Sequence, residues 1–130
     1  MFIYNCANFG NVGALISVQT WSSTKHPTIA NFYNYGKCNK ITNSVGYYIY
    51  NNCYSLQGKI NNIDSNIITE KTEEYMKLQD FINDLNNYTE SNPEGVSTVG
   101  WCKWVVGDDN LPALDFNTEW NGTAWVTVSN

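Results

Sequence analysis

The stretch Ile3-Tyr4-Asn5-Cys6-Ala7-Asn8-Phe9-Gly10 begins a phrase that this chain uses three times. It returns as Ile29-Ala30-Asn31-Phe32-Tyr33-Asn34-Tyr35-Gly36, and again as Ile49-Tyr50-Asn51-Asn52-Cys53-Tyr54-Ser55-Leu56-Gln57-Gly58. Between the aligned residues Asn5, Asn31 and Asn52 the steps are 26 and 21 residues. A period of this length is typical of solenoids, in which each repeat buries its apolar face only against the next. The phrase therefore predicts a mainly β fold with a short parallel β-helix of two to three coils over residues 1–60.

Equivalent side chains stack along the axis of such a fold. We expect Asn5, Asn31 and Asn52 to form a ladder of amide hydrogen bonds at a turn, with the preceding Ile3, Ile29 and Ile49 stacked inside. Cys6 and Cys53 occupy equivalent positions, which favours small buried apolar side chains over a disulfide. Strands are expected at Ala14–Val18, Thr28–Phe32 and Ser44–Tyr50. Short strands at this spacing also suit a β-sandwich, which is the alternative if the ladder positions lie on different faces.

Residues 61–130 differ from the repeats in composition. A polar connector at 61–70 precedes one amphipathic helix, expected over about 72–88. The apolar face of this helix contains Tyr75, Leu78, Phe81, Ile82, Leu85 and Tyr88. Short Trp-rich strands follow between Val99 and Val128. Because a solenoid leaves strand edges open at its end, we expect this region to be a C-terminal cap on the last coil. The phrase begins at residue 2, so the coils are expected to be the end of an N-terminally truncated array.

The net charge of the chain limits the classes of partner that it is expected to bind. Seven Lys, no Arg and twelve acidic residues give a net charge of −5, and the Lys are not clustered. Nucleic acids and anionic membrane surfaces are therefore not expected as partners. No apolar run approaches the ~20 residues of a membrane span, so no membrane insertion is expected. Residues 1–20 show no secretion signal.

The chemistry of catalysis is sparse in this sequence. His26, the one histidine, lies in the turn-like stretch Thr24-Lys25-His26-Pro27. The first acid is Asp64, so the repeats offer no carboxylate pair for glycoside chemistry. Near the C-terminus, Asp115 and Glu119 could in principle form a carboxylate pair, but nothing beside them suggests a buried pocket that would shift their pKa values. We therefore expect no enzymatic activity, no catalytic residue and no cofactor.

Three weaker signals concern binding and modification. Tyr33, Tyr35, Tyr47 and Tyr48 form a candidate aromatic face for stacking on sugars. Asp108, Asp109 and Asn110 are a weak Ca²⁺ candidate, because an Asp/Asn turn needs no metal. Asn87-Tyr88-Thr89 and Asn121-Gly122-Thr123 are glycosylation sequons, which are short enough to arise by chance.

A family resemblance follows from the order of motifs after the last repeat. The phrase Asn52-Cys53-Tyr54-Ser55-Leu56-Gln57-Gly58 is followed by Thr69–Met76, Asp80–Asn86, Trp104, and Asp108-Asp109-Asn110 with Leu111-Pro112-Ala113-Leu114. This order resembles the C-terminal end of bacterial surface proteins with GLUG-type repeats, over about residues 45–120. The phrase that names the repeat is degenerate here, and residues 31–34 lack the Cys. The resemblance implies a right-handed β-helix on an adhesin-like protein at the cell surface or outside the cell.

Two functional hypotheses follow. The first is a non-enzymatic terminal module of a secreted or cell-surface repeat protein, with adhesion or surface projection as its role and a host glycan or protein as its partner. The second is a structural subunit of a filament or phage-like assembly. In that case another copy would bind through the N-terminal coil edge.

Overall fold

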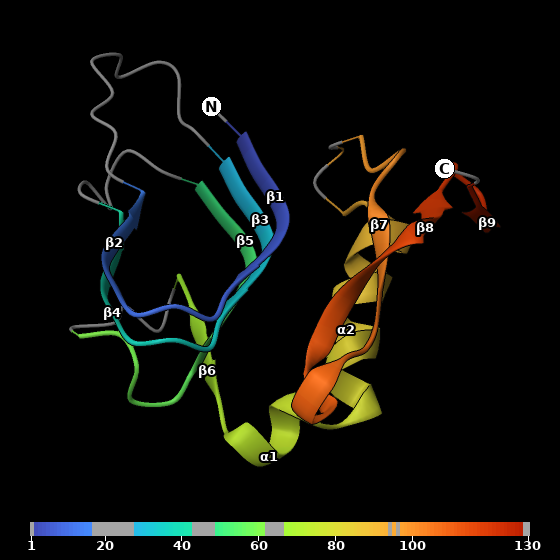
Figure 1. Ribbon diagram of the computed structural model, residues 1–130. Coiled ribbons are helices and arrows are strands. Elements are labelled where there is room, and N and C mark those ends of the chain that lie inside the picture. The colour runs from blue at the N-terminus through green and yellow to red at the C-terminus, as the bar shows by residue number, and fades with distance from the viewer. Residues whose placement is uncertain are drawn as a thin grey trace. The chain divides into compact units, whose positions relative to one another are not determined.

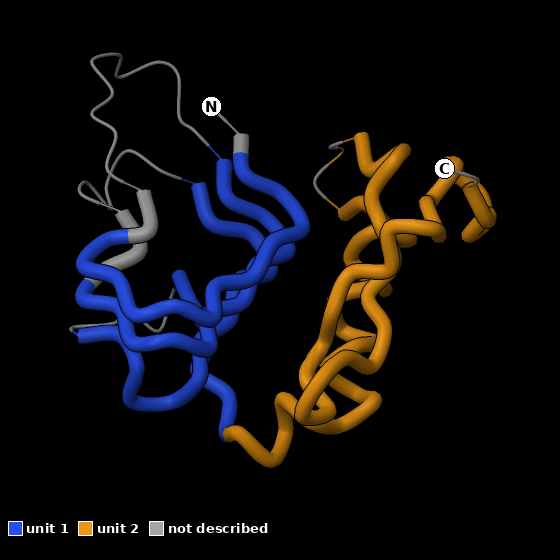
Figure 2. Tube along the Cα trace, viewed as in Figure 1, with its two compact units in different colours: residues 1–72 blue, residues 73–130 orange. Residues whose placement is uncertain are grey.

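The computed structural model describes residues 2–16, 28–42, 49–61, 67–93, 95 and 97–128 of the 130. The chain divides into two compact units, unit 1 at Met1–Thr72 and unit 2 at Glu73–Asn130 (Figure 2). Among the described residues strands are more extensive than helices. The predicted mainly β class is therefore confirmed.

Unit 1 is built from parallel strands in two sheets (Figure 1). Its strands are β1 (Phe2–Asn8), β2 (Val12–Ile16), β3 (Thr28–Asn34), β4 (Cys38–Thr42), β5 (Ile49–Leu56) and β6 (Thr69–Lys71). The larger sheet has the order β1-β3-β5-β6, and the smaller sheet pairs β2 with β4. A parallel bridge from Cys38 to Ile60 continues the smaller sheet beyond β4. The chain therefore alternates between the sheets, and each return places a strand beside its predecessor.

The repeated phrase sets the register of the larger sheet. Cys6 lies opposite Phe32, and Phe32 lies opposite Cys53, so each copy of the phrase rests on the next. Cys6 and Cys53 are thus equivalent but are separated by the intervening strand. The expected stack of three Ile side chains is wrong in its third member. Ile3 pairs with Ile29, but Ile29 pairs with Tyr50, because the third copy has one extra residue between its Ile and its ladder Asn.

This extra residue moves Ile49 out of the core. Its Cα pairs with that of Thr28, and its side chain is 44% exposed. Two other strand predictions differ from the structure at their ends. The strand expected at Ala14–Val18 is observed at Val12–Ile16, with residues 17 and 18 outside the described part. Of the strand expected at Ser44–Tyr50, residues 44–48 also lie outside it.

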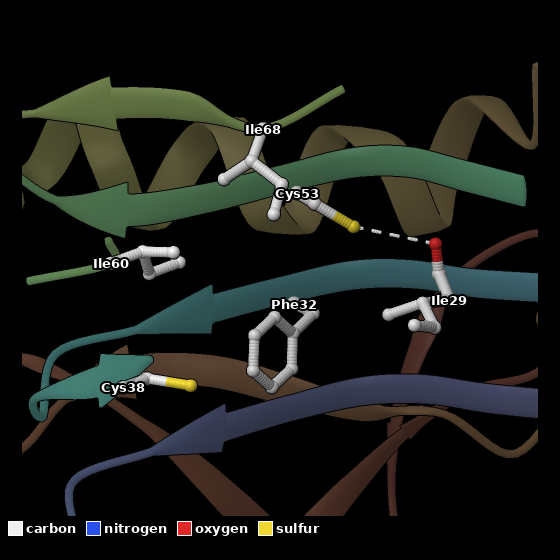
Figure 3. Close-up of a cluster of buried hydrophobic side chains, with 6 residues drawn as sticks. All are labelled: Ile29, Phe32, Cys38, Cys53, Ile60 and Ile68. Atoms are coloured by element: carbon white, nitrogen blue, oxygen red, sulfur yellow. Dashed lines mark hydrogen bonds between the residues drawn. The ribbon is translucent and has the colours of Figure 1, made fainter. Parts of the chain in front are cut away.

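The core of unit 1 draws side chains from both sheets (Figure 3). The buried members are Ile29, Phe32, Cys38, Cys53, Ile60 and Ile68. Cys38 comes from β4 in the smaller sheet, whereas Phe32 and Cys53 come from neighbouring strands of the larger one. The Cys53 thiol donates to the Ile29 carbonyl oxygen at 3.3 Å. The two sheets therefore contribute side chains to one apolar cluster.

Unit 2 begins with two helices where one was predicted. Helix α1 (Glu73–Met76) and helix α2 (Gln79–Ser91) are separated by Lys77 and Leu78, of which Leu78 is extended at φ −90° and ψ 152°. The Tyr75 hydroxyl donates to Asp84 Oδ2 at 2.6 Å. In one continuous helix these residues would lie about 13 Å apart along the axis, so this bond requires the break. Leu78 is exposed instead of lying on the predicted apolar face.

The strands of unit 2 form an antiparallel sheet of order β7-β8-β9. Its elements are β7 (Cys102–Val106), the short 3₁₀ helix η2 (Asp108–Asn110), β8 (Pro112–Trp120) and β9 (Trp125–Thr127). Helix α2 packs against β7 and β8, burying Phe81, Ile82 and Leu85. The apolar face of the helix is thus covered by strands of its own unit.

Asn86 fastens helix α2 to strand β7. Its Nδ2 donates to the Trp104 carbonyl oxygen at 2.8 Å, and its Oδ1 accepts from the Trp104 backbone N–H at 2.8 Å. Because β7 is an end strand of the described sheet, this pair of bonds supplies what a further strand would supply. The side chain of Trp104 is itself almost fully buried.

Candidate functional site

Three asparagines form a hydrogen-bonded ladder across β1, β3 and β5. Asn31 Nδ2 donates to Asn5 Oδ1 at 2.8 Å, and Asn52 Nδ2 donates to Asn31 Oδ1 at 2.9 Å. Asn31 lies in the middle strand and is fully buried. The register places the three residues at one level of neighbouring parallel strands. The side chains predicted to stack therefore lie together on one sheet.

The backbone explains why asparagine occupies these positions. Asn5, Asn31 and Asn52 have φ values of 56°, 54° and 52°, which lie in the left-handed region. Asn enters this region more readily than other residues with a side chain, because its short amide bonds locally. A left-handed residue bends each strand at the same level. One residue type thus provides both the bend in each strand and the hydrogen bond between neighbouring strands.

A second ladder runs three residues later and was not predicted. Asn8 Nδ2 donates to Asn34 Oδ1 at 2.9 Å, and Asn34 Nδ2 approaches Ser55 Oγ at 3.3 Å. Asn34 and Ser55 are fully buried. The sequence carried the signal, because Asn8, Asn34 and Ser55 repeat the 26- and 21-residue steps of the first ladder. The predicted ladder extended only to the first Asn of each phrase, so the second ladder was missed.

The second ladder also closes the turn that follows each strand. Asn8 Nδ2 donates to the Gly10 carbonyl at 2.9 Å, and Asn34 Nδ2 donates to the Gly36 carbonyl at 2.7 Å. These turns stack so tightly that a Cβ at Gly36 would collide with the backbone of Gly10 and Phe9. Glycine at position 36 is required by this close approach.

Both ladders end on β5 with a hydroxyl group. Tyr54 donates its hydroxyl to Asn52 Oδ1 at 2.6 Å, and Lys71 Nζ lies 5.8 Å from the centre of the Tyr54 ring. In the second ladder, Ser55 takes the place of Asn and donates to the Leu56 carbonyl at 3.1 Å. Strand β6, which follows, pairs with only Tyr54, Ser55 and Leu56. The amide repeat is therefore closed at this end of the sheet.

The structure does not support the predicted aromatic face. Tyr33 is fully buried, and its ring meets Phe9 edge-on at 5.7 Å between centroids. Burial raises the pKa of the Tyr33 phenol. Tyr35 is half-buried and lies 6.0 Å from Phe9. Tyr47 and Tyr48 lie outside the described residues. The prediction that Tyr33 is available to a sugar is therefore wrong, because its ring is fully buried.

The weak Ca²⁺ candidate lies in the turn between β7 and β8. Asp108, Asp109 and Asn110 form η2 and are exposed. Asp109 and Asn110 are left-handed, and the Leu111 N–H closes the turn on the Asp108 carbonyl at 3.1 Å. Within the part of the chain that the structure describes, no three His, Cys, Asp or Glu side chains gather as they would around a metal ion. The turn is explained by backbone hydrogen bonds alone.

Asp115 is held in its charged form by hydrogen bonds. Thr118 Oγ1 donates to Asp115 Oδ2 at 2.7 Å, and the Asn117 N–H donates to Asp115 Oδ1 at 3.0 Å. These bonds, with a smaller contribution from Lys103, lower the pKa of Asp115. A general acid in glycoside hydrolysis needs the opposite shift. Asp115 therefore suits a structural role, in which its carboxylate accepts hydrogen bonds from other residues of strand β8.

The four cysteines Cys6, Cys38, Cys53 and Cys102 are all free. Burial raises the pKa of Cys53 to about 12 and also raises that of Cys6. At Cys102, burial and the nearby Glu119 and Asp115 carboxylates raise the pKa. Because the thiolate is the reactive form, the thiols of Cys6, Cys53 and Cys102 are poor nucleophiles at neutral pH.

Comparisons with known proteins give no relative. No family model matches the chain, and neither a curated protein nor a solved structure is similar to it. The resemblance to GLUG-type proteins therefore depends on the quoted residues alone. In the described parts of the chain, none of the helices combines the length and apolarity needed to cross a membrane.

Proposed function

We propose that the chain is a non-enzymatic module of a secreted or cell-surface repeat protein, in which unit 1 forms stacked coils and serves adhesion or surface projection. The observation that carries this proposal is the Asn5–Asn31–Asn52 ladder. It devotes the repeated side chains of unit 1 to joining one coil to the next. A reaction centre would instead need convergent acids, bases or nucleophiles.

The proposed architecture of unit 1 is a right-handed parallel β-helix. Its support is the alternation of the chain between two parallel sheets, with the phrase in register from β1 to β3 to β5. The connections from β1 to β2 and from β3 to β4 are equally long, three residues each. The right hand is the one that parallel strand–loop–strand crossovers adopt in nearly every known case.

The two ends of the larger sheet differ in a way that favours stacking at β1. Strand β6 is three residues long and contains Glu70 and Lys71, features that discourage further pairing. Strand β1 is seven residues long and contains neither a charge nor a proline. We propose that the partner at β1 is a coil of the same kind, contributed by repeat sequence or by another copy in an assembly.

The chemistry of the described residues supports a module without catalysis. Asp115 is half-buried and has a lowered pKa, and Cys6, Cys53 and Cys102 have raised pKa values. Among the described residues the ion pair is that of Lys77 Nζ with Glu73 Oε1 at 3.2 Å, a surface contact between α1 and the turn after it. The surroundings of this carboxylate, these thiols and this ion pair are those of structural or solvated groups.

Sedimentation velocity over a wide concentration range tests the stacking. The parent chain should self-associate through β1, and Ala7→Lys, which puts a charge on that strand, should shift it to monomer. Thr127→Lys, on the exposed and short β9, is the control and should associate like the parent. Equal association of all three proteins would contradict stacking at β1.

Incubation with a panel of polysaccharides tests the absence of catalysis. The expected result is no cleavage of any glycan, whether or not it is retained by the protein. Cleavage that a single carboxylate substitution such as Asp115→Asn abolishes would overturn the proposal.

A further inference from the structure

The two glycosylation sequons of this chain lie in very different surroundings. Asn87-Tyr88-Thr89 is in the middle of helix α2, and Asn121-Gly122-Thr123 forms the turn between β8 and β9. An oligosaccharyltransferase must reach both the Asn amide and the Thr hydroxyl of a sequon in one extended or turned segment. Accessibility of the whole triplet therefore decides which sequon is usable in the folded protein.

The Asn121 turn presents all three of its sequon residues to solvent. Asn121, Gly122 and Thr123 are exposed, and Gly122 has a φ of 102°, which opens the turn. Asn121 Oδ1 accepts from Thr123 Oγ1 at 3.0 Å, from the Thr123 N–H at 2.8 Å and from the Ala124 N–H at 2.8 Å. The oxygen side of the amide is thus fixed toward the turn. Asn121 as a whole is exposed, and its acceptor nitrogen Nδ2 forms no hydrogen bond with a described residue.

The Asn87 sequon has the opposite properties. Asn87 is exposed, but Thr89 is fully buried and its hydroxyl oxygen has no contact with solvent. The carbonyl of Thr89 accepts from Thr98 Oγ1 at 2.8 Å, which ties this turn of the helix to the segment before β7. Presenting Thr89 to an enzyme would require α2 to unfold and to lose the packing of Phe81 and Leu85.

We propose that Asn121 is an N-glycosylation site that is accessible in the folded protein and that Asn87 is not. The donor is an oligosaccharide linked to a polyprenyl pyrophosphate. Asn121 Nδ2 forms a bond to the anomeric carbon of the first sugar, and the bond from that carbon to the pyrophosphate oxygen breaks. Polyprenyl pyrophosphate leaves with the electron pair, and a base of the transferase takes the amide proton. The inference rests on the proposed location outside the cytoplasm, because such donors serve exported proteins.

The test uses the purified folded chain, a single-subunit oligosaccharyltransferase that requires only the Asn-x-Thr triplet, and its polyprenyl-linked oligosaccharide. Intact-mass measurement should show one added glycan, and peptide mapping should place it on Asn121. Asn121→Gln and Thr123→Ala should each abolish the mass shift. Asn87→Gln, the matched control on the other sequon, should leave it unchanged.

Two synthetic peptides, residues 83–93 and 117–127, separate sequence from structure. Both peptides should be modified, because neither is held in a fold, whereas the folded chain should be modified at Asn121 at least 10-fold faster than at Asn87. An unmodified Asn121 in the folded chain, or equal modification of both sites, would overturn the inference. These outcomes leave the stacking of unit 1 untouched, so the two proposals fail independently.

Discussion

The two units solve the problem of buried polar groups in different ways. In unit 1, side chains bond to equivalent side chains of the neighbouring strand, as in Asn31 with Asn5. In unit 2, side chains bond to backbone groups of a different element, as Asn86 does with Trp104 and Thr98 does with Thr89. A repeated phrase can supply its own partners indefinitely. A segment that occurs once has to find a partner elsewhere in its unit.

The two units also differ in their content of charged residues. Unit 1 contains five of the seven Lys and only two acids, Asp64 and Glu70, whereas unit 2 contains two Lys and ten acids. Stacked coils place equivalent residues about 4.8 Å apart, so a charge in the phrase would face its own copy. Neutral amides avoid this repulsion. Unit 2 has no such repeat and can carry its acids on exposed turns and helix faces.

The largest expected effect concerns the packing of helix α2 against the strands of its own unit. Phe81 is fully buried where α2 packs against β7 and β8, so Phe81→Ala should lower the free energy of unfolding by about 3–5 kcal/mol. Urea unfolding followed by Trp fluorescence reports on this unit, because four of the five Trp lie in it. Phe116→Ala, at a ring that is 69% exposed, should change stability by less than about 0.5 kcal/mol.

Breaking the first ladder at its centre should cost unit 1 about 2–4 kcal/mol. Asn31→Leu removes the bonds that Asn31 forms with the buried Asn5 and the half-buried Asn52, and it forces a branched apolar residue into a left-handed conformation. Hydrogen exchange of the β3 and β5 amides should accelerate, while that of α2 should not. Asn39→Leu is the control, because Asn39 forms only an exposed bond to Asn61. Similar effects of the two changes would show that the ladder does not stabilise the coils.

The two hydrogen bonds that join the Asn86 side chain of α2 to the edge of β7 should together stabilise unit 2 by about 2–3 kcal/mol. Asn86→Ala leaves the buried N–H and C=O of Trp104 without partners, and each such group carries a desolvation penalty. Chemical denaturation of this variant should be compared with that of Asn87→Ala, one residue along the same helix but exposed. If the two variants unfold at the same denaturant concentration, the Asn86 bonds are not stabilising.

The smallest effect is a pH dependence from the helix break. The hydrogen bond to Asp84 is the main reason that the pKa of Tyr75 is raised from 10.0 to about 12. Because the folded pKa is the higher one, the bond stabilises the protein fully below pH 10 and is lost as the pH rises toward 12. Tyr75→Phe should remove this part of the alkaline loss of stability in pH-dependent melts. An unchanged alkaline profile would mean that the bond does not form in solution.

The repeated phrase predicted the ladder positions, but it did not predict which other side chains are buried. The ladder positions were visible because Asn5, Asn31 and Asn52 recur with their flanking residues. The displacement of Ile49 was not visible, because one extra residue before Asn52 changes which side chain faces inward. Periodicity alone also could not exclude Tyr33 from the surface, since burial depends on what covers a face and not on the strand itself.

The helix break and the Asn86 attachment lay beyond sequence reasoning for a related reason. Residues 72–88 have a continuous helical pattern without proline or glycine, so nothing local marks Leu78 as a boundary. The break is instead accompanied by the Tyr75–Asp84 bond and by the Tyr75–Phe81 ring contact at 6.0 Å. Such tertiary preferences override local propensity and leave no pattern in one sequence.

The unequal lengths of the two long connections in unit 1 bear on how such a protein changes through time. Eleven residues separate β2 from β3 and six separate β4 from β5, yet the ladder residues keep their spacing of three within every strand. The difference in length thus falls entirely between the smaller sheet and the next strand of the larger sheet. Descendants of this chain could vary the length of these connections while inheriting the same ladder spacing. Peptide libraries placed between β2 and β3 would turn this tolerance into a display platform.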